Sequence, residues 1–319
     1  MTFHSGGAPL PQNLRGAVIA LGNFDGFHLG HQAVVGRAVA RAKAEGRPAI
    51  VATFDPHPAR YFRPETPHFR LTTLEQRARL FAEAGADATL VIDFDADLAA
   101  LSPEQFVVDE LVGRFGAAVA VTGEDFTFGK ARAGTTAMLA SLGSSHGLAA
   151  ETVTPVADDE GVISSTRIRA ALQAGDCATA TRLLTRPFAI EAEVVHGDKR
   201  GRELGYPTAN MELGDYLRPR YGIYAVKARL DDGRVLDGVA NLGIRPSFDP
   251  PRELLEPYFF DFKGDLYGRT IEVALNAFLR GEAKFDSLEA LKAQMAADSE
   301  AARHILQSPF SNTAHPEEG

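Results

Sequence analysis

A ten-residue segment near the N-terminus combines the residue types that bind phosphate. Residues 22–31 read G-N-F-D-G-F-H-L-G-H and follow an apolar run over residues 17–21. From Gln32 onward, apolar residues recur at helical spacing. The pattern predicts a strand, a tight glycine loop and a helix in succession.

The chemistry of this segment follows from its histidines and glycines. The start of a helix offers free backbone N–H groups and the positive end of the helix dipole, so an anion is favoured there. His28 and His31 can donate hydrogen bonds to phosphate oxygens, and the glycines let the backbone come close to them. Glycine-rich turns are also common in α/β proteins, and a metal site would need a third ligand that the segment lacks. We expect a nucleotide phosphate at this turn.

Three further polar segments lie next to predicted strands or helices. Residues 53–58 read T-F-D-P-H-P, residues 123–129 read G-E-D-F-T-F-G, and residues 164–169 read S-S-T-R-I-R. The last segment offers hydroxyls, N–H groups and two guanidiniums to phosphate oxygens. Taken singly, the three segments also fit a rigid turn, a solvated acidic loop and an ordinary helix N-cap.

The second half of the chain contains a glycine-rich basic segment and one isolated carboxylate. Residues 197–210 read G-D-K-R-G-R-E-L-G-Y-P-T-A-N, which predicts a loop able to cover phosphates. Thr208 and Asn210 offer hard oxygen ligands to Mg²⁺. Glu256 lies in an apolar run, where an unpaired carboxylate would be costly. A polar hairpin and a structural salt bridge are the alternatives for these two features.

The elements that must position these residues change character near Pro187. Before it, strand-like and helix-like segments alternate, and Thr72 and Glu75 have capping-box spacing. This alternation predicts a parallel sheet with helices on both faces, whose ligands gather at the carboxyl ends of the strands. After it, five strand-like runs separated by Gly, Asp and Pro predict a small antiparallel barrel. A helix over residues 287–306 follows the barrel.

These patterns give a fold class of α/β plus all-β. We expect one domain over residues 1–185 and a second over residues 186–308. Residues 309–319 are expected to form a disordered tail.

Composition limits the classes of function. The chain has 319 residues, of which 45% are hydrophobic and 24% charged, and no run approaches the length of a membrane span. A formal charge of −9 argues against a nucleic-acid surface, which needs clustered Lys and Arg. Cys177 is the only cysteine, so no intrachain disulfide can form, which fits the cytoplasm. We expect neither nucleic-acid nor membrane partners, and a weak homo-oligomer stays open.

The four N-terminal segments resemble those of the bacterial bifunctional riboflavin kinase/FAD synthetase family, which has an N-terminal Rossmann-like nucleotidyltransferase domain. The resemblance continues through P-T-A-N at residues 207–210, N-L-G-I-R-P-S-F at residues 241–248 and R-G-E-A-K-F at residues 280–285. It implies that the C-terminal domain phosphorylates riboflavin with ATP to give FMN. The N-terminal domain would then transfer the adenylyl group of a second ATP to FMN, giving FAD and pyrophosphate, with Mg²⁺ as cofactor.

The resemblance also implies roles for individual residues. Glu256 would be the general base that accepts the proton of the riboflavin 5′-hydroxyl, while Thr208 and Asn210 would hold Mg²⁺. His28 and His31 would contact the ATP phosphates during an in-line transfer that needs no protein nucleophile. Further contacts with ATP or its phosphates are expected from Gly22, Phe24, Asp25, Gly26, Gly30, Ser164, Ser165, Thr166, Arg167, Gly197, Arg200, Gly201 and Gly205. Contacts with the flavin are expected from Asp125, Phe126, Arg280 and Phe285.

Some positions depart from the family pattern, and other functions stay open. Thr185 stands where the family usually has glycine, and Pro257-Tyr258 replaces a commoner valine-histidine pair. One alternative is another H-x-G-H nucleotidyltransferase, with a C-terminal domain that binds flavin without catalysis. Another is a regulatory flavin-binding protein with inactive sites, which would be expected to lack His28 or Glu256.

Overall fold

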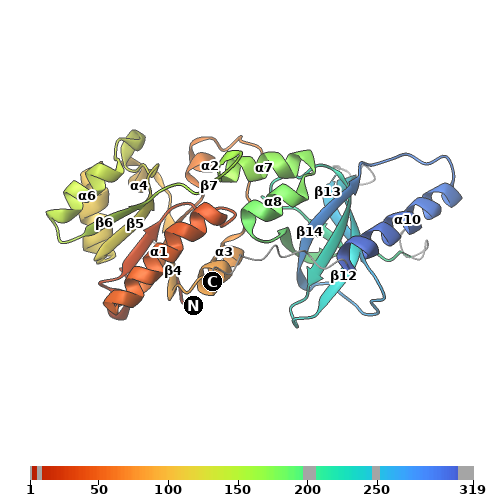
Figure 1. Cartoon of the computed structure of the whole chain (residues 1–319), viewed down its shortest axis with the longest axis horizontal. Helices are drawn as coiled ribbons and strands as arrows, with labels where there is room; N and C mark the ends of the chain where they lie inside the picture. Colours follow the sequence, from red (N-terminus) through yellow and green to blue (C-terminus); the bar gives the residue numbers. More distant parts are fainter. Residues whose placement is uncertain (1, 6–8, 197–205, 246–251, 308–319) are drawn as a thin grey trace, which may run out of the picture. The chain divides into compact units, whose positions relative to one another are not determined.

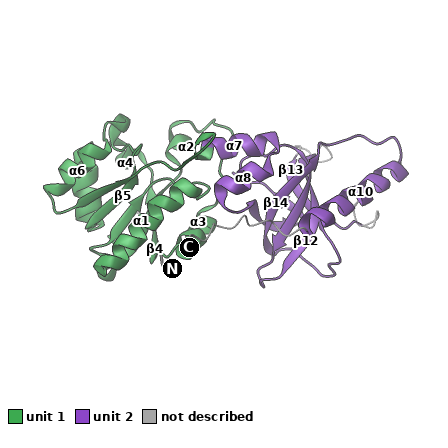
Figure 2. Cartoon of the chain, viewed as in Figure 1, with its two compact units in different colours: residues 1–165 green, residues 166–319 purple. Residues whose placement is uncertain are grey.

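The computed structural model describes residues 2–5, 9–196, 206–245 and 252–307 (Figure 1). The chain forms two compact units, residues 1–165 and residues 166–319 (Figure 2). Helices α7 (Ser165–Ala174) and α8 (Cys177–Leu184) belong to the second unit except for the first residue of α7. The boundary between the two compact units thus lies at residue 165, earlier than the expected domain boundary at residue 185. The functional boundary at residue 185 stays a prediction. The expected tail over residues 309–319 lies outside the described residues.

The first unit is built on a six-stranded sheet in which every strand pair is parallel, as the sequence predicts. The strands run in the order β1-β4-β3-β2-β5-β6. From β2 the chain proceeds through β3 to β4 on one side, and then to β5 and β6 on the other. The two directions separate between β2 and β5, which is the topological switch point where such sheets bind ligands. The strands are β1 (Thr2–Ser5), β2 (Val18–Leu21), β3 (Ala49–Asp55), β4 (Ala88–Asp93), β5 (Val119–Gly123) and β6 (Ala149–Val153).

Helices cover both faces of this sheet because successive strand residues point to opposite faces. Val18 and Ala20 belong to one buried cluster with apolar residues of α1 and with Phe81 of α3. Ile19 and Leu21 belong to a second cluster with residues of α6 and the π-helical segment η2. The helices of the unit are α1 (Leu29–Glu45), α2 (Pro58–Phe62), α3 (Leu74–Glu83), α4 (Ala96–Ala100), α5 (Pro103–Gln105), η2 (Phe106–Arg114) and α6 (Thr136–Ser144). Short 3-10 turns η1 (Gln12–Leu14) and η3 (Lys130–Arg132) and a hairpin of β7 (Ala157–Asp158) with β8 (Gly161–Val162) complete it.

The second unit contains a closed six-stranded antiparallel barrel, in the order β10-β13-β12-β11-β14-β9. Five of these strands correspond to the five predicted runs. The sixth, β10, begins at the last residue of the P-T-A-N segment and was not predicted, since three residues show no clear alternation. The strands are β9 (Phe188–Val195), β10 (Asn210–Glu212), β11 (Gly222–Arg229), β12 (Val235–Arg245), β13 (Arg252–Phe259) and β14 (Thr270–Arg280).

The C-terminal helix α10 (Leu288–Gln307) packs against β11, β12 and β14 (Figure 1). Ala302 and Leu306 are buried there against Ala225 and Phe260. The Ser287 hydroxyl accepts a hydrogen bond from the Ala290 N–H and caps the helix. Among the described residues, no helix is both long and apolar enough to cross a membrane.

Candidate active sites

The loop of residues 22–28 leaves the carboxyl end of β2 at the switch point and leads into α1. His28 is the N-cap of α1, and its Nδ1 accepts a hydrogen bond of 3.4 Å from the His31 N–H. The two imidazole rings stack at 3.6 Å between centroids with an interplanar angle of 21°. Because Nδ1 accepts a hydrogen bond, the neutral His28 ring carries its proton on Nε2, which can donate to a phosphate oxygen. A Cβ at Gly30 would lie 3.2 Å from the His28 ring, so glycine leaves room for this stack.

The backbone of this loop adopts conformations that L-residues seldom take. Phe24 and Phe27 have φ values of 49° and 45°, and Gly26 has a φ of 86°. Both phenylalanine rings are buried and meet the Phe81 ring of α3 edge-on, at 5.7 and 5.1 Å between centroids. The packing on α3 therefore compensates for the unfavourable backbone of the loop.

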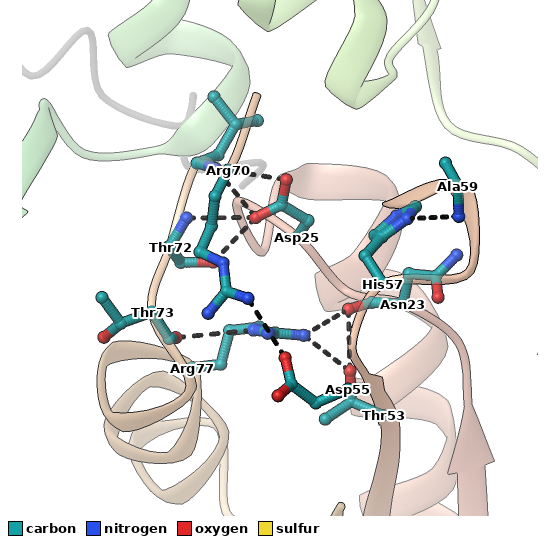
Figure 3. A network of polar contacts seen from close by, with 11 residues as sticks. Asn23, Asp25, Thr53, Asp55, His57, Ala59, Arg70, Thr72, Thr73 and Arg77 are labelled. Carbon is teal, nitrogen blue, oxygen red and sulfur yellow. Dashed lines mark hydrogen bonds and ion pairs between the residues drawn. The ribbon is translucent and has the colours of Figure 1, made fainter. Parts of the chain in front are cut away.

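Asp25 is bound by the segment that precedes α3 (Figure 3). Its carboxylate is 4% exposed and accepts hydrogen bonds from the N–H groups of Leu71 and Thr72, at 2.9 and 3.0 Å. The Thr72 hydroxyl in turn accepts a bond of 3.0 Å from the Gly26 N–H. Asp25 thus holds the shape of the loop.

Arg77 is a buried cation behind the same loop (Figure 3). It donates hydrogen bonds to the Asn23 carbonyl at 2.8 Å and to the Thr53 hydroxyl at 2.7 Å. Burial lowers the pKa of its guanidinium, while nearby Asp25 raises it. Sequence reasoning missed this residue. The available signal was a charge four positions before Phe81, on the buried face of an amphipathic helix.

The segment of residues 164–167 begins next to the loop of residues 22–28, which we call the nucleotide loop. The Ser165 hydroxyl donates a hydrogen bond of 2.8 Å to the Asp25 carbonyl. The Ile163 carbonyl lies 3.5 Å from the position that a Gly30 Cβ would take. Helix α7 begins at Ser165, so Thr166 and Arg167 lie in its first turn. The structure brings the start of this segment and the histidine loop together, and a shared role in binding phosphate stays a prediction.

Aromatic side chains gather around the carboxyl end of β3. Phe54, Tyr61 and Phe62 each meet the Phe94 ring edge-on, at 6.0, 5.3 and 5.7 Å between centroids. Phe62 is 64% exposed, which is unusual for so large an apolar ring.

The segment after β5 contributes two further residues with a predicted role. The Phe126 ring stacks on Phe128 at 5.8 Å and packs against the core of the unit. Asp125 is exposed, and its carboxylate lies 2.9 Å from where a Gly123 Cβ would be. Glycine at position 123 thus allows the close turn that presents Asp125.

Glu256 of the second unit lies on β13 opposite Asn241 of β12. Its side chain is 15% exposed and forms an ion pair with Arg245, four residues further along β12 on the same face. The Asn241 Nδ2 lies 3.4 Å from Glu256 Oε2. The salt bridge considered from the sequence is therefore present, while the role of Glu256 as a base stays a prediction.

The P-T-A-N segment runs beside the strand of Glu256. The Ala209 N–H donates a hydrogen bond of 2.9 Å to the Pro257 carbonyl, and Met211 pairs with Leu255. One step along this antiparallel register, Asn210 comes opposite Glu256. Thr208 is half-buried and Asn210 is 8% exposed. A hydroxyl and an amide oxygen beside a carboxylate fit Mg²⁺, which prefers hard oxygen ligands and takes others from phosphates.

Arg280 is tied to helix α10. It makes a bidentate ion pair with Asp298, with the shortest distance 2.7 Å, and donates to the Gly281 carbonyl at 2.9 Å. The Gln294 amide also donates to Asp298, at 2.9 Å. The Arg280 guanidinium lies 5.7 Å from the centroid of the Phe285 ring, so both predicted flavin residues lie together.

Four residues with a predicted role lie outside the described residues: Gly197, Arg200, Gly201 and Gly205. Within the described ranges no cluster of three His, Cys, Asp or Glu residues is arranged to hold a metal ion.

Comparisons with known proteins agree with the division into two kinds of site. The family model of FAD synthetase matches residues 10–167, and that of riboflavin kinase matches residues 184–306. Three curated relatives are named bifunctional riboflavin kinase/FMN adenylyltransferase. The one from Pseudomonas fluorescens is 42% identical over 91% of this chain and 93% of its own. Those from Escherichia coli K12 and Bacillus subtilis 168 are each 39% identical, covering 91% and 90% of this chain and 93% and 91% of their own lengths.

One solved structure shares nearly the whole fold. A Streptococcus pneumoniae protein that bears the name macrolide-efflux protein superposes with a TM-score of 0.84 at 31% identity. The match covers 95% of this chain and 99% of that protein.

Proposed function

This chain belongs to the bifunctional riboflavin kinase/FMN adenylyltransferase family, and from that premise we propose which residues perform its two reactions. The C-terminal domain converts riboflavin and ATP into FMN and ADP. The N-terminal domain converts FMN and a second ATP into FAD and pyrophosphate. Both reactions consume ATP, which supports a cytoplasmic location.

His28 and His31 bind the phosphates of ATP in the adenylyl transfer. The stack of these two rings at the start of α1, at the switch point of the sheet, is the observation that carries this proposal. Negative charge grows on the phosphate oxygens in the transition state, and N–H donors fixed in place stabilise it. Ser164, Ser165, Thr166 and Arg167 are the residues proposed to hold the leaving pyrophosphate.

The aromatic cluster around Phe94 and the pair Phe126 and Phe128 form the side of the site that receives the flavin. An exposed ring such as Phe62 offers a face on which the isoalloxazine can stack. Asp125 contacts the bound nucleotide or flavin from the end of β5. Asp25 supports the loop from behind, where its oxygens accept backbone hydrogen bonds.

Glu256 is the general base of the kinase reaction. It accepts the proton of the riboflavin 5′-hydroxyl as that oxygen attacks the γ-phosphorus. Thr208 and Asn210 hold Mg²⁺, which neutralises charge on the ATP phosphates. Arg245 orients the Glu256 carboxylate through their ion pair. Arg280 and Phe285 contact the flavin ring.

The test is an assay of the purified chain with riboflavin, ATP and Mg²⁺, with flavins separated by chromatography. We expect FMN to appear first and FAD to follow, and EDTA to stop FMN formation. A parallel reaction with added FMN isolates the second step. FAD formed only from added FMN would contradict an active kinase site, and the absence of both products would contradict the whole assignment.

A further inference from the structure

The hydrogen-bond ladder between β2 and β3 ends where the chain leaves β2 for the loop of residues 22–28, while β3 continues to Asp55 beside β4. Its last bond runs from the Gly22 N–H to the Ala52 carbonyl, at 3.2 Å. The next residues, Asn23 and Thr53, start the nucleotide loop and the T-F-D-P-H-P segment. Beyond Ala52, among the described residues, no further backbone hydrogen bond of this ladder joins the segments that continue β2 and β3.

Side chains take over the connection at this point (Figure 3). The Asn23 carbonyl accepts a hydrogen bond of 2.8 Å from the Thr53 hydroxyl and another of 2.8 Å from Arg77 Nη1. Arg77 Nη1 also donates to the Thr53 hydroxyl at 2.7 Å. Arg77, Thr53 and Asn23 therefore form a closed triangle of hydrogen bonds that joins the loop after β2 to the last residues of β3.

Arg77 is well suited to a fixed position. It is 3% exposed, and its Nε donates to the Thr73 carbonyl in the first turn of α3 at 3.4 Å. A planar guanidinium can donate in several directions at once, which a single ammonium does less well. Burial of a cation is costly, so its full set of carbonyl and hydroxyl partners is needed to keep it there.

Helix α3 holds the rest of the loop as well. Phe81 packs against the Phe24 and Phe27 rings, and Thr72 binds Asp25 and Gly26. The loop ends at His28, the N-cap of α1. The backbone path from β2 to the histidines is thus imposed by α3, which supplies none of the groups assigned to ATP.

We propose that Arg77 is a positioning residue for adenylyl transfer, which keeps the nucleotide loop and the T-F-D-P-H-P segment at the spacing that in-line attack requires. This inference rests on the proposed function of residues 22–31. Misplacement of reacting groups by about 1 Å costs about 100-fold in rate. Arg77 therefore controls the geometry of the reaction without touching either substrate.

The first test compares Arg77→Met and Arg77→Lys by steady-state kinetics of FAD formation from FMN and ATP. For Arg77→Met we expect kcat to fall about 100-fold with the KM for ATP changed less than about threefold. Arg77→Lys keeps a donor for Asn23 and Thr53, and we expect its kcat to be at least about tenfold higher than that of Arg77→Met. Riboflavin kinase activity of the same chain is the internal control and should stay within about twofold, because it belongs to the other unit.

A matched control makes the same chemical change two residues along α3. Arg79→Met removes a half-buried guanidinium from the same helix and should leave kcat for FAD formation unchanged.

The second test is Thr53→Val, which removes the hydroxyl but almost no volume. We expect a loss in kcat of about tenfold, and the double variant Arg77→Met/Thr53→Val should lose little more than Arg77→Met alone, since one triangle is broken in both.

Circular dichroism melting separates positioning from folding. If Arg77→Met does not fold, Thr53→Val and Arg77→Lys carry the test, and wild-type kcat in both overturns the proposal. Wild-type kcat in folded Arg77→Met overturns the proposal directly, as does a change confined to KM.

His28→Ala separates failure of the proposed function of the loop from failure of the role of Arg77. If His28→Ala still makes FAD at the wild-type rate, the proposed function of the loop fails. If it does not, while Arg77→Met is normal, only the role of Arg77 fails.

Discussion

The two proposed active sites obtain their residues in different ways. In the first unit the two histidines and the three glycines near them come from one continuous segment, residues 22–31, at a strand-to-helix turn. In the second unit Asn210, Asn241 and Glu256 come from three strands that neighbour one another in the barrel. The geometry of the first site depends on the conformation of one loop, and that of the second depends on the register of neighbouring strands.

This difference determines what supports each site. Backbone hydrogen bonds hold the register of the barrel strands, so the side chains around Glu256 are not needed to keep these strands in place. The nucleotide loop has left its ladder and depends on side chains, namely Asp25, Thr53 and Arg77. Substitutions behind the loop should therefore affect its reaction, whereas the barrel site should respond mainly to changes in the reacting groups themselves.

The largest expected effect is that of Glu256→Gln. The amide cannot accept the hydroxyl proton, so we expect FMN formation to fall by about 1,000-fold. FAD formation from added FMN should be unchanged, since it belongs to the other unit. Chromatographic product assays measure both rates. Glu272→Gln, which removes a surface ion pair with Arg229, is the control and should change neither. Retained kinase turnover in Glu256→Gln would remove the base assignment.

The next effect is that of His28→Ala. Loss of one fixed phosphate donor should lower FAD formation by about 100-fold or more, with FMN formation spared. The same assays with riboflavin and with FMN as substrate check it. His146→Ala removes an exposed imidazole at the end of α6 and should have no effect. Equal losses in both reactions would show that the variant damages the whole chain.

A smaller effect is expected from Asp25→Asn. Oδ1 accepts from the N–H groups of Leu71 and Thr72, and Oδ2 accepts from Leu71 as well. Asparagine removes the negative charge and one acceptor, so even with its oxygen in the Oδ1 position an NH₂ group would face the Leu71 N–H. We expect the free energy of unfolding of the first unit to fall by about 2 kcal/mol, measured by urea titration. Asp97→Asn at an exposed position of α4 should change it by less than about 0.5 kcal/mol. An unchanged midpoint for Asp25→Asn would contradict its supporting role.

The smallest effect is expected from Thr185→Gly, and it has the opposite sign. Thr185 ends α8 with a φ of 64°, in the left-handed region that disfavours a β-branched residue. Glycine should therefore stabilise the second unit by about 1 kcal/mol, seen as a rise in its melting temperature. Thr181→Gly, inside the same helix, should lower the melting temperature. A fall for Thr185→Gly would show that the hydroxyl outweighs the backbone strain.

Much of the fold followed from local patterns. Alternating segments predicted the parallel sheet, and strand-like runs separated by Gly, Asp and Pro predicted the barrel. The cap of α3 was predicted one residue too early, because Thr73 with Gln76 makes the capping box, and Thr72 binds the nucleotide loop instead. Strands β1 and β10 were missed because four and three residues carry too little periodicity to be distinguished from loops.

The sequence by itself determined the chemistry that this protein can perform, because glycine, imidazole, hydroxyl and carboxylate groups in short segments retain their character wherever the chain places them. Only the tertiary structure decided which distant side chains hold those segments in place. The Arg77 contact spans 54 residues to Asn23, and the Arg245 contact depends on the register of β12 with β13. Such contacts depend on the packing of whole elements, and no local sequence pattern encodes the partner of a buried charge.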